Sequence, residues 1–174
     1  DELVEETLWR HGLTGSDLCI EVTESVLIDD PKQVMALFEE LRDLGVKIHL
    51  DDFGTGYSSL SALHNFPMDS IKVDRSFIQR IGEDQGSFEV VNATKSILTE
   101  LLSEYVDIVF ANEEEGSTFT GIEDDYASIA LQIAELCEIA AVKVGAHGSY
   151  IAHSGIVEKI KPVHAAHLID TTGA

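Results

Sequence analysis

Residues 46–60 read VKIHLDDFGTGYSSL, an apolar run followed by two acids and a glycine-rich turn. An apolar run that ends in polar residues is typical of a buried parallel strand whose carboxyl end opens onto a site. We therefore predict a strand over residues 46–50. Similar short runs predict strands over residues 18–22 and 70–73.

Helices are predicted between these strands. Asp30 and Pro31 mark the start of one helix, because Asp is a good cap and Pro is tolerated in the first turn. Further helices are expected over residues 58–65 and 75–81, and a long amphipathic helix over residues 86–105. Alternating strands and helices predict an α/β fold with a largely parallel sheet. The predicted buried stripe of the first helix comprises Val34, Leu37, Phe38, Leu41 and Leu44.

The second half continues with strands and one clear helix. Apolar runs predict strands over residues 107–111 and 140–144, with a helix over residues 126–137 between them. Short segments separated by turn signals follow, which predicts an antiparallel extension near the C-terminus. These last strands are expected over residues 149–153, 156–160 and 167–169.

The composition is that of a folded soluble domain, with 44% apolar and 25% charged residues among 174. The formal charge of −21 opposes association with a polyphosphate backbone, so we expect no nucleic-acid-binding surface. No apolar stretch reaches the roughly 18 residues of a membrane-spanning helix, and the first six residues include four acids and no base, whereas a signal peptide starts with basic residues. We therefore expect a cytoplasmic protein without membrane contact.

Acidic residues are expected to gather at one edge of the predicted sheet. Glu21, Asp51 and Asp52 fall at predicted strand ends, and Lys72 lies on the next strand. Clustered carboxylates repel each other unless a cation intervenes, and their oxygens suit Mg²⁺ or Mn²⁺. Such a cation can activate water and stabilise the oxygens of a phosphodiester. The alternative is that the acidic pair is a helix cap or a solvated loop.

Three motifs in the first half resemble the EAL family of cyclic di-GMP phosphodiesterases, whose fold is a TIM barrel. They are residues 21–24, 51–60 and 71–77, in the order and spacing of that family, and the resemblance covers about residues 8–85. It implies that Glu21, Asp51 and Asp52 are metal ligands, that Lys72 orients the attacking water or the phosphate, and that Glu24 braces the loop after the second acidic strand.

The motifs do not make up the whole EAL pattern. The Glu-Ala-Leu strand of the family and the metal-binding Asn after it would precede Asp1. The next family strand ends in a metal-binding Glu, whereas this chain has Asn112 at that position. Because the ligands of such a site act as a unit, losing several of them is expected to cost many orders of magnitude in rate.

Residues 101–174 resemble the C-terminal part of the ribokinase/adenosine-kinase family of sugar kinases, a three-layer α/β fold. The motifs are residues 105–115, 142–145 and 170–174. The resemblance implies a nucleotide site, in which Asn112 and Glu115 help to place Mg²⁺ and phosphates. Its other expected residues are Lys143, Gly145 and Gly148 near the nucleotide, Gly173 at the start of an anion hole, and Asp170 in the same terminal motif.

Local structure also explains parts of this second set. A tight turn accounts for Lys143-x-Gly145-x-x-Gly148, and an exposed helix start accounts for the acids over residues 113–115. In the family, the segment that matches residues 170–174 is followed by Gly-Asp, whose Asp is the catalytic base, and this Asp would come after Ala174. Phosphoryl transfer is therefore not expected.

Both resemblances cover only parts of their families, and they meet within one predicted helix. We expect a partial EAL-like barrel over residues 1–85, a joining helix over 86–105 and a ribokinase-like fragment over 106–174, or one merged domain. The interpretation is an engineered or recombined chimera without native catalytic activity, with exposed sheet edges that favour a homodimer. The alternatives are residual binding of a divalent metal and cyclic di-GMP, with phosphodiesterase activity at most as a remnant, or weak binding of ATP.

Overall fold

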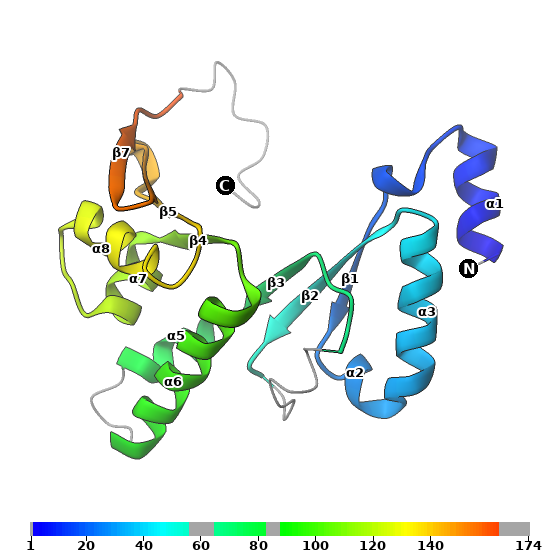
Figure 1. Ribbon diagram of the computed structural model, residues 1–174, viewed down its shortest axis with the longest axis horizontal. Coiled ribbons are helices and arrows are strands. Elements are labelled where there is room, and N and C mark those ends of the chain that lie inside the picture. The colour runs from blue at the N-terminus through cyan, green and yellow to red at the C-terminus, as the bar shows by residue number, and fades with distance from the viewer. Residues whose placement is uncertain (1, 56–64, 83–87, 164–174) are drawn as a thin grey trace. The chain divides into compact units, whose positions relative to one another are not determined.

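The computed structural model describes residues 2–55, 65–82 and 88–163 (Figure 1). The chain divides into two compact units, Asp1–Ile97 and Leu98–Ala174. The division falls inside the long helix α6 (Phe88–Tyr105), whose Leu98, Leu101 and Leu102 are buried. Among the described residues, no helix combines the length and apolar character that a membrane crossing requires.

The first unit contains a parallel sheet in the order β1-β2-β3. Its strands are β1 (Cys19–Thr23), β2 (Lys47–Phe53) and β3 (Ser70–Val73). Ile48 and Leu50 lie on the same face of the central strand β2 and are completely buried, whereas Lys47 on its other face is exposed. The strand β3 has the predicted bounds, whereas β2 extends three residues further than predicted and includes both acids.

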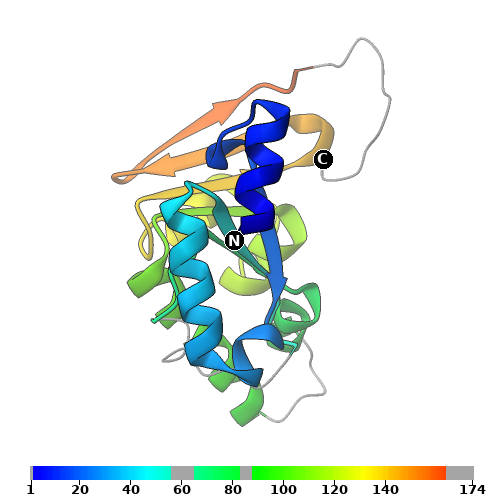
Figure 2. The same ribbon diagram turned by 90° about the vertical axis from the view of Figure 1, so that its right-hand side faces the viewer.

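Helices precede, connect and follow these strands. They are α1 (Glu2–His11), α2 (Val26–Asp29), α3 (Pro31–Asp43) and α5 (Arg75–Gly82), together with a 3₁₀ turn, Gly15–Asp17. The helix α3 runs alongside the sheet (Figure 2). Its predicted cap is confirmed, because the side chain of Asp30 accepts a hydrogen bond from the Gln33 amide at 3.2 Å.

The buried stripe of α3 is narrower than predicted. Phe38 and Leu41 are buried, but Leu37 is 43% exposed, so its assignment to the core was wrong. Successive helical residues are about 100° apart, and Leu37 lies at the border of the stripe that Phe38 and Leu41 define. Phe38 packs edge-on against Phe66, with ring centroids 5.8 Å apart.

The second unit contains a separate, mixed sheet in the order β4-β5-β6-β7. Its strands are β4 (Ile108–Asn112), β5 (Ile139–Lys143), β6 (Ser149–His153) and β7 (Ile156–Ile160). Strands β4 and β5 are parallel, and β6 and β7 add antiparallel. The predicted α/β class with an antiparallel C-terminal extension is therefore confirmed. The predictions for residues 58–64 and 167–169 lie outside the described residues.

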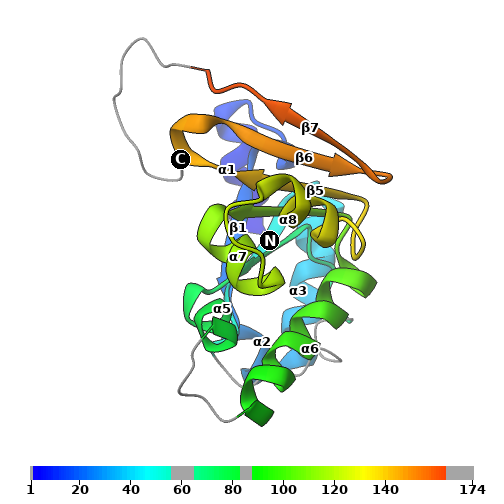
Figure 3. The same cartoon turned by 90° about the vertical axis from the view of Figure 1, so that its left-hand side faces the viewer.

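Two helices, α7 (Glu113–Thr120) and α8 (Tyr126–Ile133), cover one face of this sheet (Figure 3). Ile129 of α8 and Val142 of β5 are completely buried there. The helix predicted over residues 126–137 was too long. After Ile133 the chain turns, and the amides of Glu138 and Ile139 donate to the carbonyl of Asp107, which leads the chain into β5.

The opposite face of this sheet carries exposed apolar side chains. The strand registers place five of them on that face, and Phe110 is 71% exposed. They are Ile108, Phe110, Ile151, Ile156 and Ile160. Exposed apolar side chains on one face of a sheet are typical of an interaction site, but the expected homodimer stays a prediction.

Candidate cation and phosphate site

Lys72 lies between two of the predicted metal ligands. Its Nζ is 2.5 Å from Oε1 of Glu21 and 3.7 Å from Oδ2 of Asp51. The hydrogen bond to Glu21 and the negative charge of Asp51 raise the pKa of Lys72 above its ordinary value, so the ammonium is charged at neutral pH. The carboxylates outnumber the ammonium, which leaves this edge of the sheet negative.

An irregularity in the sheet places the acids opposite Lys72. Leu50 pairs with Ile71 and Phe53 pairs with Val73, so Asp51 and Asp52 of β2 face a single residue, Lys72, on β3. A bulge of this kind puts two residues against one, kinks the strand and redirects side chains. No pattern in the sequence indicated this bulge, which carries two successive acids past the same lysine.

The backbone of Asp52 has a positive φ of 55°, a conformation that Asp tolerates better than most residues. Oδ1 of Asp51 accepts a hydrogen bond from the Asp52 amide at 3.0 Å. The carbonyl of Asp52 in turn accepts from the hydroxyl of Thr55 at 2.9 Å. Asp52 therefore starts the turn that follows β2, and its side chain is exposed.

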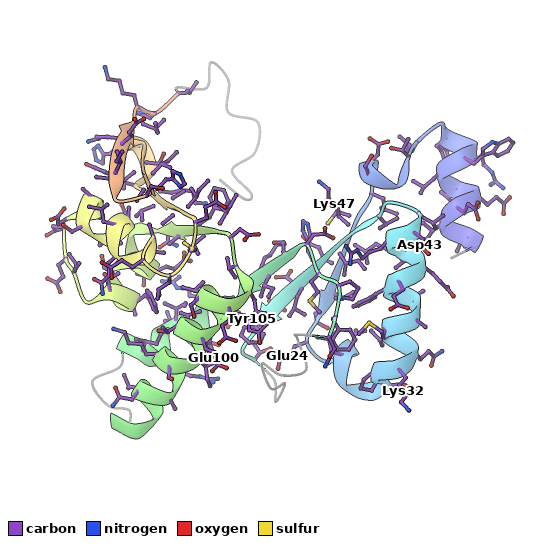
Figure 4. The ribbon with its side chains drawn as sticks, viewed as in Figure 1. Glu24, Lys32, Asp43, Lys47, Glu100 and Tyr105 are labelled. Carbon is purple, nitrogen blue, oxygen red and sulfur yellow. The ribbon has the colours of Figure 1, made fainter. Side chains whose placement is uncertain are left out.

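Glu24 is buried, with only 3% of its surface exposed. Its Oε2 accepts a hydrogen bond from the amide of Gly54 at 3.1 Å, which ties the segment after β1 to the turn after β2 (Figure 4). On the other side of this turn, Gly54 lies against the ring of Phe77. The contact is consistent with the bracing role expected for Glu24.

Asp69 is a supporting residue that sequence reasoning missed. Its Oδ2 accepts from the amide of Ile48 at 2.9 Å, and its own amide donates to the carbonyl of Ile48 at 2.8 Å. These two bonds fix β3 against β2 three residues before Lys72. The sequence did offer a signal for this role, because Asp69 follows Pro67 and directly precedes a predicted strand. Asp side chains at such positions commonly form hydrogen bonds to the backbone.

The structure thus brings Glu21, Asp51 and Lys72 together, and Asp52 directly follows Asp51 in the chain. Among the residues that are described, no group of three His, Cys, Asp or Glu side chains is arranged to hold a metal ion. The donor set still fits a hard divalent cation, because carboxylate oxygens are its preferred ligands and the edge is electronegative. Glu21 and Asp51 would hold the ion.

In the second unit, two predicted site residues form a helix cap. Asn112 Oδ1 accepts from the amide of Glu115 at 2.9 Å, and Glu115 Oε2 accepts from the amide of Asn112 at 2.9 Å. This reciprocal arrangement is a capping box at the start of α7. The acids at this helix start also complement the positive end of the helix dipole.

The remaining predicted nucleotide residues lie at the end of β5. Lys143 is its last residue, and Gly145 and Gly148 flank the turn that leads to β6, each with a positive φ. Asp170 and Gly173 lie outside the described residues. A cavity of about 480 Å³ opens beside this turn. It is lined by Glu113, Tyr126, Val144, His147, Tyr150 and Lys159.

The chain thus has two α/β parts: one with a parallel sheet and an acidic carboxyl edge, and one with a mixed sheet and a glycine turn beside a cavity. The EAL domain model matches residues 2–115, and the model of the pfkB family of carbohydrate kinases matches residues 71–174. The chain belongs to the EAL domain family over the first range and to the pfkB family over the second.

Known relatives support the first assignment. The chain is 47% identical over 90 residues to the cyclic di-GMP phosphodiesterase NbdA of Pseudomonas aeruginosa, a match that covers 52% of this chain and 12% of that protein. It is 32% identical over 124 residues to the cyclic di-GMP phosphodiesterase PdeA of Borreliella burgdorferi, a match that covers 71% of this chain and 18% of that protein. The chain therefore spans less than a fifth of these relatives.

A solved structure of a PaMucR phosphodiesterase in complex with c-di-GMP has the same fold over part of its length. It superposes with a TM-score of 0.52 at 32% identity, covering 68% of this chain and 48% of that one. The manganese and cy-diGMP complex of Klebsiella pneumoniae BlrP1 gives a TM-score of 0.50 at 27% identity, covering 68% and 30%.

Proposed function

We propose that the first unit binds a divalent cation, Mg²⁺ or Mn²⁺, and with it the phosphodiester of cyclic di-GMP, without efficient hydrolysis. The observation that supports this best is the meeting of Glu21, Asp51 and Lys72 at the carboxyl edge of a parallel sheet. Two carboxylates offer ligands to a cation, and the ammonium offers a charge to a phosphate oxygen.

Each residue has a distinct role in this proposal. Glu21 and Asp51 hold the cation, Lys72 binds the phosphate, and Glu24 keeps the turn with Asp52 in place through Gly54. When bound, the cation supplies charge neutralisation and lowers the pKa of a coordinated water. The manganese and the cyclic dinucleotide named for the solved EAL structures support this choice of ligands.

The proposed lack of turnover is supported by Asn112. In the EAL resemblance a metal-binding Glu stands at this position. Here the side chain caps α7, and its strand β4 pairs with β5 rather than with β3. We propose that the chain is a recombined or engineered chimera, in which the strand that follows β3 belongs to the kinase-like part.

Thermal unfolding with Mn²⁺ and cyclic di-GMP tests the binding, because a ligand that binds the native state raises its stability. We expect Mn²⁺ to raise the melting temperature of the wild type, with a further rise when cyclic di-GMP is added. The double substitution Asp51→Ala/Asp52→Ala removes one cation ligand and its neighbour, so both shifts are expected to disappear.

A second double substitution, Asp124→Ala/Glu123→Ala, removes the same charge from an exposed turn of the second unit and serves as the control. It should keep both shifts. If wild type and the Asp51→Ala/Asp52→Ala variant respond equally to millimolar Mn²⁺ and cyclic di-GMP, the proposed site is wrong.

Asn112→Glu tests the proposed reason for the lack of turnover. This substitution puts the Glu of the EAL family at position 112 of the chain. It should not produce hydrolysis of cyclic di-GMP, because the side chain at this position caps α7. Stability should fall by about 1 kcal/mol, since Glu is a poorer cap than Asn. Chromatography of cyclic di-GMP incubated with Mn²⁺ measures the first effect, and urea unfolding measures the second. Phosphodiesterase activity gained by this variant would contradict the proposal.

A weaker second candidate is adenine-nucleotide binding by the second unit. The cavity beside the 144–148 turn supports it, since Tyr126 and Tyr150 offer aromatic surface and Lys159 offers a positive charge. The Lys159 Nζ lies 5.2 Å from the centre of the Tyr150 ring. The same melting experiment with Mg²⁺ and ATP tests this candidate, and no shift at millimolar ATP would exclude it.

A further inference from the structure

The ammonium of Lys72 occupies the position at which a cation would bridge two carboxylates. Its Nζ contacts Glu21 at 2.5 Å and Asp51 at 3.7 Å. A divalent ion held by the same two side chains must approach each within about 2.0–2.6 Å. An ammonium and a divalent cation cannot share this space, because both sterics and like-charge repulsion oppose it.

We propose that Lys72 is a built-in competitor of the cation, and that the phosphate of the ligand relieves this competition by drawing the ammonium away. This inference rests on the proposed function, since it concerns the same site. It makes cation and nucleotide binding cooperative: the cation displaces Lys72 from Glu21, and the displaced ammonium becomes available to a phosphate oxygen.

The surroundings of Lys72 permit this exchange. Its side chain is 49% exposed, and a Lys ammonium is a compact charge on a flexible four-carbon stem. The backbone on both sides is held, because Ile71 and Val73 pair with β2 on either side of the bulge. The side chain can therefore move to a new partner while the strand stays in register.

Thermodynamic linkage gives this arrangement a measurable signature. If cyclic di-GMP draws Lys72 away from the carboxylates, it raises the affinity for Mn²⁺, and Mn²⁺ must raise the affinity for cyclic di-GMP by the same factor. The cation and the phosphate also attract each other directly, so a lysine that only stabilises the sheet would leave the size of this coupling unchanged when it is replaced. Removing the ammonium should therefore raise the affinity for Mn²⁺ and lower the affinity for cyclic di-GMP.

The experiment measures Mn²⁺ binding by electron paramagnetic resonance, with and without cyclic di-GMP, in four proteins. These are the wild type, Lys72→Met, Lys72→Arg and the control Lys47→Met. Lys47 starts β2, at the end of the same sheet away from Glu24 (Figure 4), and it is exposed. Its replacement removes the same charge outside the site, and Lys72→Arg keeps the charge within it.

We expect Lys72→Met to bind Mn²⁺ about tenfold more tightly than the wild type, because the ammonium no longer competes with the ion for Glu21 and Asp51. The same variant should bind cyclic di-GMP more weakly and show a weaker coupling between the two ligands. Lys72→Arg should keep the weak Mn²⁺ affinity of the wild type, and Lys47→Met should change it less than twofold.

Two outcomes would overturn the inference in distinguishable ways. If the wild type binds Mn²⁺ at the Asp51-dependent site but Lys72→Met binds it no more tightly than Lys47→Met, the competition is refuted while the proposed function stands. If neither the wild type nor Lys72→Met binds Mn²⁺, the proposed function and the inference fail together. Circular dichroism on each variant verifies that it is folded.

Discussion

Gly148→Ala is expected to destabilise the second unit by roughly 3–5 kcal/mol. Gly148 has φ 93° and ψ −139°, a backbone conformation that is essentially restricted to glycine. A Cβ at this position would also overlap the carbonyl oxygen of Ile160. That oxygen belongs to the backbone of β7, so no side-chain rotation relieves the overlap.

Gly145→Ala is the matched control for this prediction. Gly145 is three residues away in the same turn and has a φ of 45°, but no atom lies within 4 Å of its added Cβ. Gly145→Ala should lower the free energy of unfolding by only about 1–2 kcal/mol, the usual penalty for a non-glycine residue in a left-handed conformation. Hydrogen exchange of the amides in β5, β6 and β7 locates the effect in this unit. Equal losses for the two variants would show that the contact with Ile160 is unimportant.

Gly54→Ala is expected to cost roughly 2–4 kcal/mol and to abolish the binding of Mn²⁺. Gly54 has a φ of 98°, and its added Cβ would collide with the Phe77 ring. Because the Gly54 amide donates to Glu24, moving this turn breaks a buried hydrogen bond and displaces the acids that precede it. Stability and metal affinity should therefore fall together.

Gly12→Ala provides the comparison for this second substitution. Gly12 also has a positive φ, 66°, and no atom lies within 4 Å of its added Cβ. It follows α1, away from the acidic edge in sequence, so it should lower stability slightly and leave the Mn²⁺ affinity unchanged. Urea unfolding and Mn²⁺ titration of both variants give the two measurements. Normal Mn²⁺ affinity in Gly54→Ala would show that the turn does not position the acids.

The strands were more predictable than the helix ends. Short apolar segments bounded by turn signals located β3, β6 and β7 at their observed bounds. The helix α8 ends at Ile133, four residues before the predicted end at residue 137. The chain after it is directed into β5 by hydrogen bonds to the carbonyl of Asp107, which is distant in sequence. Leu37 was assigned to the core because helical periodicity identifies a stripe but not its width.

The candidate site was predictable in its residues and less so in its geometry. The sequence identified Glu21, Asp51 and Lys72 on neighbouring strands, and parallel pairing brings them together. The sequence did not identify the bulge opposite Lys72 or the clamp by Asp69, because both depend on the register between β2 and β3. Asn112 and Glu115 were expected at a phosphate site, and the structure pairs them in a capping box.

The sequence predicted the α/β class, the resemblance to two families, and the acids and lysine of the candidate site, because strand patterns, motif spacing and residue chemistry can be read along the chain. The separation of the strands into two sheets and the position of Lys72 between Glu21 and Asp51 emerged only from the folded chain. Sheet membership and side-chain contacts depend on pairing between distant segments. Several pairings satisfy the same local pattern, and only the packing of the whole chain selects one.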